Sequence, residues 1–250
     1  MKFLHTSDWH LGRDFMNYDL APYQDDFLEQ ILTQIEAHRP DALLITGDVL
    51  DKPNPSDADL DKLSGFLNEA RQMTRIILIA GNHDGASRLG FAKGFTLPEV
   101  NIVTKAAQVG TAIEVPGPDG ELGALVYPIP YLSPYQDRAE LSTWVDEDEV
   151  RHLDDTLEQR ASKDDPAPLL PAKPEVLFAA ALRRIGRDLE QRNTEVPVLA
   201  MAHDYLTQVD PDEEVEPLGN LYPIPVSLLD DFAGILKGSR GLDYLALGHI

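Results

Sequence analysis

Short apolar runs alternate with longer amphipathic segments along the N-terminal part of the chain. The runs at residues 2–6, 42–46 and 76–80 have the length and composition of buried strands. Between them, residues 19–38 and about 60–71 place apolar side chains at helical spacing, which predicts two amphipathic helices. Strands that are apolar throughout and alternate with helices favour a parallel sheet covered on both faces.

The rest of the chain has shorter elements and more charge. A turn sequence rich in proline and glycine at residues 116–120 predicts a hairpin between the strands that flank it. Two acidic stretches, at residues 146–155 and 210–216, are expected to be solvated surface. The further predicted elements are strands at 101–104, 111–115, 122–127, 197–201 and 243–247 and a helix at 175–192.

Polar side chains that can bind metal follow five of the predicted strands. In an open α/β sheet the ligand site lies outside the carboxyl ends of the strands, so residues far apart in the chain would meet there. One histidine after a strand is usually only a hydrogen-bonded residue, but five coincidences at the same kind of position favour a shared site. The residues are Asp8 and His10, Asp48, Asn82 and His83, His203, and His249.

The chemistry open to this set is narrow. Oxygen and nitrogen ligands without thiolates suit manganese, iron, zinc or similar divalent ions. The set exceeds what one ion needs and therefore predicts two ions, and a pair ~3.5–4 Å apart supports in-line displacement at phosphorus by water. One carboxylate would bridge them, and Asp48, central in the chain order, is the natural choice.

Composition limits the partners and the compartment. The 250 residues carry a formal net charge of -22, the opposite of a protein held to nucleic acid by bulk electrostatics. The chain has no cysteine, which excludes disulfides and thiolate metal sites. Neither an N-terminal export signal nor an apolar stretch of spanning length is present, so we expect a cytoplasmic protein without membrane association.

The wording around these residues resembles the calcineurin-like metallophosphoesterases, and within them the nuclease subunits of bacterial DNA-repair complexes. The resemblance is dense over residues 1–90 and resumes around His203 and at 243–249. It implies an α/β fold in which two sheets form a β-sandwich flanked by helices, with the metal site at the carboxyl ends of the strands. The motifs are His-Thr-Ser-Asp-Trp-His-Leu-Gly-Arg at 5–13, Gly-Asp-Val-Leu-Asp at 47–51, Ile-Ala-Gly-Asn-His-Asp at 79–84 with Arg-Leu-Gly at 88–90, and Gly-His at 248–249.

The resemblance also implies a role for each polar residue. Asp48 would bridge two divalent ions, with manganese expected and magnesium, iron or zinc as alternatives. His83 would face the scissile phosphate as a catalytic residue, with Asp84 orienting its imidazole. The implied ligands are Asp8, His10 and Asp48 for the first ion, and Asp48, Asn82, His203 and His249 for the second.

The expected domain is a single metallophosphoesterase nuclease domain over residues 1–250. The family pattern is Gly-His-x-His, and the sequence stops at Ile250, one residue before the second histidine. We therefore expect a chain that lacks the fourth ligand of the first ion, the capping domain and the partner-binding segment. Weaker occupancy of the first ion and low activity would follow.

The implied function is DNA hydrolysis, as a 3′–5′ exonuclease and endonuclease in double-strand break processing. DNA ends and hairpins, an ATPase subunit and a second copy of the chain are the implied partners, and Arg13, beside the first motif, is expected to contact substrate. A phosphoesterase acting on small nucleotides or phosphoproteins would share every ligand, and a non-catalytic scaffold could retain the motifs. The apolar stripe Leu60, Leu63, Phe66 and Leu67 fits either a dimer face or a cover for the sheet.

Overall fold

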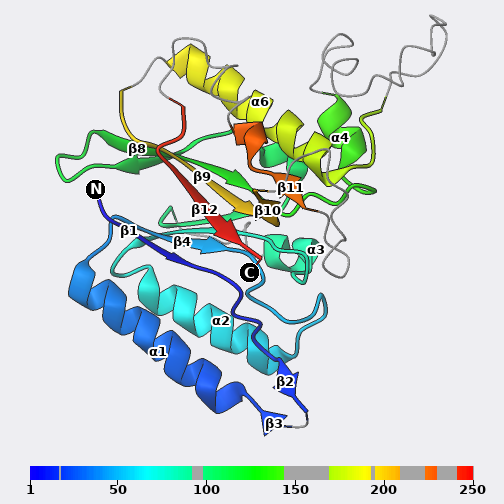
Figure 1. Ribbon diagram of the computed structural model, residues 1–250. Helices are drawn as coiled ribbons and strands as arrows, with labels where there is room; N and C mark the ends of the chain where they lie inside the picture. Colours follow the sequence, from blue (N-terminus) through cyan, green and yellow to red (C-terminus); the bar gives the residue numbers. More distant parts are fainter. Residues whose placement is uncertain are drawn as a thin grey trace, which may run out of the picture.

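The computed structural model describes most of the chain. The described residues are 1–16, 18–91, 98–143, 169–192, 195–208, 223–229 and 241–249. The predicted acidic stretches at 146–155 and 210–216 lie outside them. Two four-stranded sheets pack face to face, with helices on both outer surfaces (Figure 1).

The first sheet is parallel throughout and is built from the N-terminal half. Its order is β1 (Phe3–Thr6), β4 (Ala42–Thr46), β5 (Arg75–Ile79) and β6 (Val100–Val103). β4 is fully buried, as its unbroken apolar sequence predicts for a strand covered on both faces. The predicted strand–helix alternation is confirmed, and all four strands end at the same edge.

The second sheet takes its strands from the rest of the chain. Its order is β12 (Tyr244–Gly248), β9 (Val198–His203), β8 (Leu122–Ile129) and β7 (Ile113–Pro116). β7 and β8 form the predicted antiparallel hairpin, and the other neighbours pair in parallel. The two-sheet sandwich implied by the resemblance is therefore present, with a core of small and branched side chains between the sheets.

Three long helices cover the sandwich. α1 (Ala21–His38) and α2 (Asp57–Ala70) pack on the first sheet, and α6 (Pro174–Arg192) packs on the second (Figure 1). α2 begins with a capping box between Ser56 and Asp59, which satisfies free main-chain donors of its first turn. α1 ends at Arg39, whose backbone is left-handed, directly before Pro40.

The apolar stripe of α2 belongs to the core of a single chain. Leu63 and Phe66 are buried, and Leu60 and Leu67 pack partly buried against the same cluster. Of the two roles left open by the sequence, covering the sheet is the one the fold uses. A homodimer would need another surface.

Several short elements were not predicted. They include the hairpin of β2 (Asp14–Phe15) and β3 (Tyr18–Asp19), which sits beside the start of α1 (Figure 1). The others are α3 (Ala86–Phe91), the 3-10 turn η2 (Ala106–Gln108), α4 (Arg138–Ser142) and the strand pair β10 (Leu206–Thr207) and β11 (Ile224–Pro225). No helix among the described residues is long and apolar enough to cross a membrane.

Candidate metal centre

The predicted site residues meet where the strands of both sheets end. Of the six non-glycine residues with positive φ in the described part of the chain, four are predicted ligands. Side chains rarely adopt this backbone conformation, and such strain gathers at functional sites because the surrounding structure enforces it. The four are Asp8, His10, Asp48 and His249.

His203 is held in place from within the fold. It ends β9 and is fully buried, and its Nδ1 lies 2.6 Å from the main-chain oxygen of Thr46 at the end of β4. A carbonyl can only accept, so Nδ1 carries the proton and Nε2 presents a lone pair. This is how a second partner fixes the tautomer of a metal-binding histidine.

The free Nε2 of His203 is the centre of a group of donor atoms. It lies 3.1 Å from Asn82 Oδ1, 3.0 Å from His249 Nδ1 and 3.3 Å from Asp48 Oδ2. Ions of this kind bind nitrogen and oxygen at about 2.0–2.2 Å, so neighbouring ligands of one ion lie about 3 Å apart or slightly more. The spacing fits a common ion better than it fits hydrogen bonds, because two acceptor nitrogens face each other.

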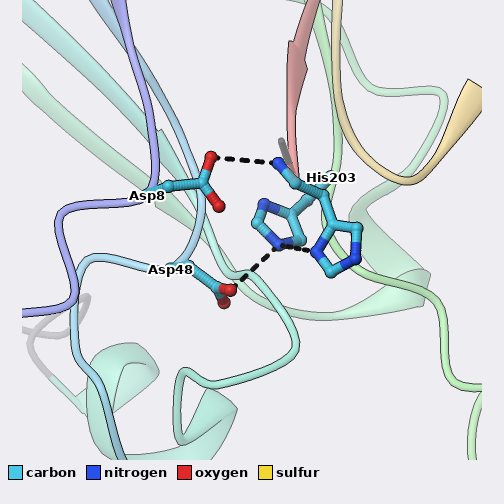
Figure 2. Close-up of side chains that lie close together, drawn as sticks. Asp8, Asp48 and His203 are labelled. Atoms are coloured by element: carbon cyan, nitrogen blue, oxygen red, sulfur yellow. Dashed lines mark hydrogen bonds and ion pairs between the residues drawn. The ribbon is translucent and has the colours of Figure 1, made fainter. Parts of the chain in front are cut away.

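A second group surrounds His10. Its Nε2 lies 3.8 Å from Asp48 Oδ2 and 4.0 Å from Asp8 Oδ1. Asp48 therefore stands between the two groups, and Figure 2 shows Asp8 and Asp48 both facing His203. The main chain aligns the loops that carry these residues, since His10 N donates to Asp48 O and Asp8 N donates to Gly47 O.

The electrostatics of the centre follow from burial and pairing. Burial alone would raise the pKa of Asp48, but its hydrogen bond and charge interaction with His203 and the His83 N–H lower it. Burial lowers the pKa of His10 and of His249, which keeps both rings neutral and able to bind metal. His249 Nε2 is buried without a hydrogen-bond partner, as expected for a nitrogen whose partner is an ion.

His83 sits beside this centre and is exposed. Its ring lies edge-on to that of His10, with ring centroids 4.9 Å apart, and its Nδ1 is 2.9 Å from the main-chain oxygen of Asp51. That contact places the proton on Nδ1 and leaves Nε2 free. The ring is therefore oriented by Asp51.

The expected role of Asp84 as the orienting carboxylate is wrong in this structure. Its two oxygens accept hydrogen bonds from Gly81 N at 2.8 Å and Leu50 N at 3.0 Å. Asp84 is buried, and this burial raises its pKa. Its carboxylate ties the loop after β5 to the loop after β4, and so positions His83 through the backbone alone.

The family model of the calcineurin-like phosphoesterases matches residues 1–250. The chain belongs to that family. It is 33% identical over 136 residues to SbcD, the nuclease component of SbcCD, from Escherichia coli K12, covering 54% of this chain and 34% of that protein. It is 27% identical over 262 residues to the protein of the same name from Bacillus subtilis, covering 100% of this chain and 56% of that protein.

This phosphoesterase therefore spans between about a third and just over half of the length of those relatives. Among solved structures, a dimetal phosphatase from Danio rerio is similar with a TM-score of 0.45 and 14% identity. That similarity covers 84% of this chain and 71% of the other. The family match and the side-chain cluster together make the chain a metallophosphoesterase whose aspartates and histidines are able to hold divalent ions.

Two glycines let the loops of the phosphoesterase centre approach one another. A Cβ on Gly81 would collide with the main-chain nitrogen and carboxylate of Asp48, and one on Gly248 would collide with Thr46 O and Ser7 Oγ. The polar cluster can close only because these positions lack side chains. The sequence shows both glycines within its motifs, and the structure gives the steric reason.

Arg13 lies at the rim of the centre. It is exposed and lines a cavity of about 290 Å³ together with Asp8 and His10, and its charge opposes protonation of His10 by lowering the pKa of that ring. The expected contact between Arg13 and substrate fits this position. Gln24 of α1 supports the same loop by donating to His10 O at 2.8 Å.

Asp51 was missed as a functional residue, although the sequence motif includes it. Besides the carbonyl that orients His83, its carboxylate Oδ1 lies 3.4 Å from His10 Nδ1. A carboxylate behind a ligand histidine is a recurrent support for metal binding. The signal available in the sequence was its place three residues after Asp48, on the same loop.

Proposed function

We propose that this protein is a metal-dependent DNA nuclease, acting as a 3′–5′ exonuclease and an endonuclease. The observation that carries the proposal is Asp48 standing between two groups of donor atoms, with His83 exposed directly beside them. The similarity to the SbcD nucleases supports DNA as the substrate.

In this proposal Asp8, His10 and Asp48 hold one divalent ion, and Asp48, Asn82, His203 and His249 hold the other. The donor set is made of carboxylate, amide and imidazole, which suits manganese, with magnesium, iron or zinc as alternatives. When bound, two such ions supply Lewis acidity and a water of lowered pKa. The residues supply the geometry: His203 is fixed by Thr46, and Asp48 by the His83 N–H.

His83 acts on the phosphate rather than on an ion. Its Nδ1 proton is committed to Asp51 O, so Nε2 is the nitrogen that faces substrate. An imidazole in this position can donate to a phosphate oxygen or protonate the leaving oxygen. Its exposure gives a bulky phosphodiester access from solvent.

The partners follow from the same relatives. We propose DNA ends and hairpins as substrates, an SbcC-type ATPase as the partner subunit, a homodimer as the assembly and the cytoplasm as the compartment, in DNA double-strand break processing. The surface of such a homodimer is not the apolar stripe of α2, because that stripe packs on the first sheet.

A nuclease assay of the parent chain and His83→Ala tests the proposal. Linear DNA, hairpin DNA, cyclic nucleotide and bis(p-nitrophenyl) phosphate would each be supplied with manganese, magnesium or zinc. We expect manganese-dependent DNA cleavage that falls about 10²- to 10⁴-fold in His83→Ala. His38→Ala, an exposed histidine at the end of α1, is the matched control and should cleave like the parent.

Cleavage of small esters or cyclic nucleotide without any cleavage of DNA would favour the small-nucleotide alternative. Parent and His83→Ala chains with the same rate on every substrate would contradict a role for His83 altogether.

A further inference from the structure

Exposed apolar side chains gather next to the metal centre. Ten large hydrophobic residues are exposed in the described part of the chain, and five of them lie on β2, β3, the turn between them and the first turns of α1. Exposed patches of this kind mark binding surfaces. The five are Phe15, Met16, Tyr18, Tyr23 and Phe27.

Two of these aromatics share a cavity with the predicted metal ligands. The cavity of about 290 Å³ that is lined by Asp8 and His10 is also lined by Tyr23 and Phe27. A chain whose phosphate lies at the metal centre therefore has the two rings within reach of its adjoining residues. Tyr23 is 71% exposed and Phe27 is 36% exposed, so both present ring surface to an occupant.

The two rings are presented side by side from a rigid support. Residues four apart on a helix have neighbouring side chains, with Cβ atoms about 5–6 Å apart. Phe27 packs edge-on against Trp9, with centroids 6.1 Å apart, and Trp9 is buried and donates from Nε1 to Thr6 Oγ1 at 2.9 Å. Little side-chain freedom is therefore left for a ligand to remove from Phe27.

Charge favours bases over phosphates as the groups that bind here. Asp14, Asp19 and Asp26 are exposed around the two rings, and the whole chain carries a net charge of -22. A phosphate backbone would be repelled by these carboxylates, with Arg13 as the one cation lining the described cavity. Aromatic faces bind nucleobases irrespective of sequence and without requiring positive charge.

We propose that Tyr23 and Phe27 form a stacking face for unpaired bases of a single-stranded DNA segment adjoining the scissile phosphate. This rests on the proposed nuclease function and names the form of its substrate. Paired bases hide their faces inside the duplex, so the stacking face gives the centre a preference for frayed ends, hairpin loops and single strands. It also explains how an acidic protein holds DNA.

Binding of labelled oligothymidylate and of a matched abasic oligonucleotide to the manganese-loaded chain tests the stacking face. The His83→Ala background prevents cleavage during the measurement. Tyr23→Ala should weaken oligothymidylate binding about tenfold, as expected for loss of one stacked base, while leaving the salt dependence unchanged. Abasic binding should not change, because that ligand has no base to stack.

Three variants serve as controls. Tyr23→Phe keeps the ring and should bind like its parent. Tyr244→Ala removes an exposed tyrosine from the opposite end of β12 and should also bind like its parent. Arg13→Ala should weaken both ligands and reduce the salt slope, since it removes a charge and no ring.

The outcomes separate this inference from the nuclease proposal. If the chain with native His83 cleaves DNA and Tyr23→Ala cleaves and binds single strands equally well, the stacking face is wrong and the nuclease proposal stands. Hydrolysis of bis(p-nitrophenyl) phosphate without DNA cleavage overturns the nuclease proposal and the stacking face with it. A dimer seen by sedimentation that Tyr23→Ala dissolves would assign the patch to a second copy and overturn the inference.

Discussion

The Nδ1 atom of His83 lies 2.9 Å from the main-chain oxygen of Asp51, while the carboxylate of Asp84 points to Gly81 N and Leu50 N instead. The motif Gly-Asn-His-Asp thus divides its work between the site and the backbone. A main-chain oxygen cannot be removed by substituting a side chain, so the orientation of His83 is independent of the side chain at position 51.

The carboxylate of Asp51 has a separate role that can be tested alone. Because Oδ1 lies 3.4 Å from His10 Nδ1, Asp51→Asn should weaken manganese binding about 10- to 100-fold while His83 keeps its carbonyl partner. Metal titration of the purified chain measures this. Asp119→Asn removes the same charge from an exposed turn and should bind manganese like the parent. Equal affinity of Asp51→Asn and parent would contradict the role.

Asp84 should prove to be a residue of stability. Its two oxygens accept from two buried main-chain donors, and an asparagine can accept with only one of them. We expect Asp84→Asn to lower the free energy of unfolding by about 1–3 kcal/mol, the cost of a buried donor left without its acceptor. Urea unfolding of the metal-free chain would show this. An unchanged unfolding midpoint would mean that the donors find another partner.

Glycine substitutions separate close approach from helix propensity. Gly248→Ala would drive a methyl group against Thr46 O and Ser7 Oγ, so it should abolish metal binding and reduce expression of folded protein. Gly65→Ala in the interior of α2 meets nothing within 4 Å and should stabilise the chain by about 0.5–1 kcal/mol. Thermal unfolding of both variants checks the pair. Tolerance of Gly248→Ala would refute the steric account.

His5 should make stability depend on pH. Burial lowers its pKa from the ordinary value of 6.5, so the unfolded chain binds the proton more tightly. The stability contributed by neutral His5 is therefore complete above pH 6.5 and is lost as pH falls toward the lowered value. In the metal-free chain, His5→Gln should lose less stability than the parent between about pH 7 and 5.5. Parallel losses would exclude His5 as a source.

The sequence predicted the strands of the site well because each is a short apolar run that ends in a polar residue. β4 was predicted to the residue, since burial on both faces requires an unbroken apolar sequence. The meeting of His203 with Asp48 could also be expected, because parallel strands bring their carboxyl ends to one edge.

Other features depend on contacts that no local pattern encodes. The direction of the Asp84 carboxylate is set by donors on two loops, and the stripe of α2 would look the same on a sheet or at a dimer interface. The hairpin of β2 and β3 has only two residues in each strand, too few for a periodic signal. The value of Asp51 lies mostly in its main-chain oxygen, which every residue type has.

The central claim is that Asp48 joins two ions into one centre, and electron paramagnetic resonance of the manganese-loaded chain tests it most directly. At saturation the parent should show the signal of two exchange-coupled manganese ions, and Asp48→Asn, which keeps the size of the side chain but cannot bridge, should lose it. A parent with only isolated manganese ions, or an Asp48→Asn chain that retains the coupled pair, would contradict the account.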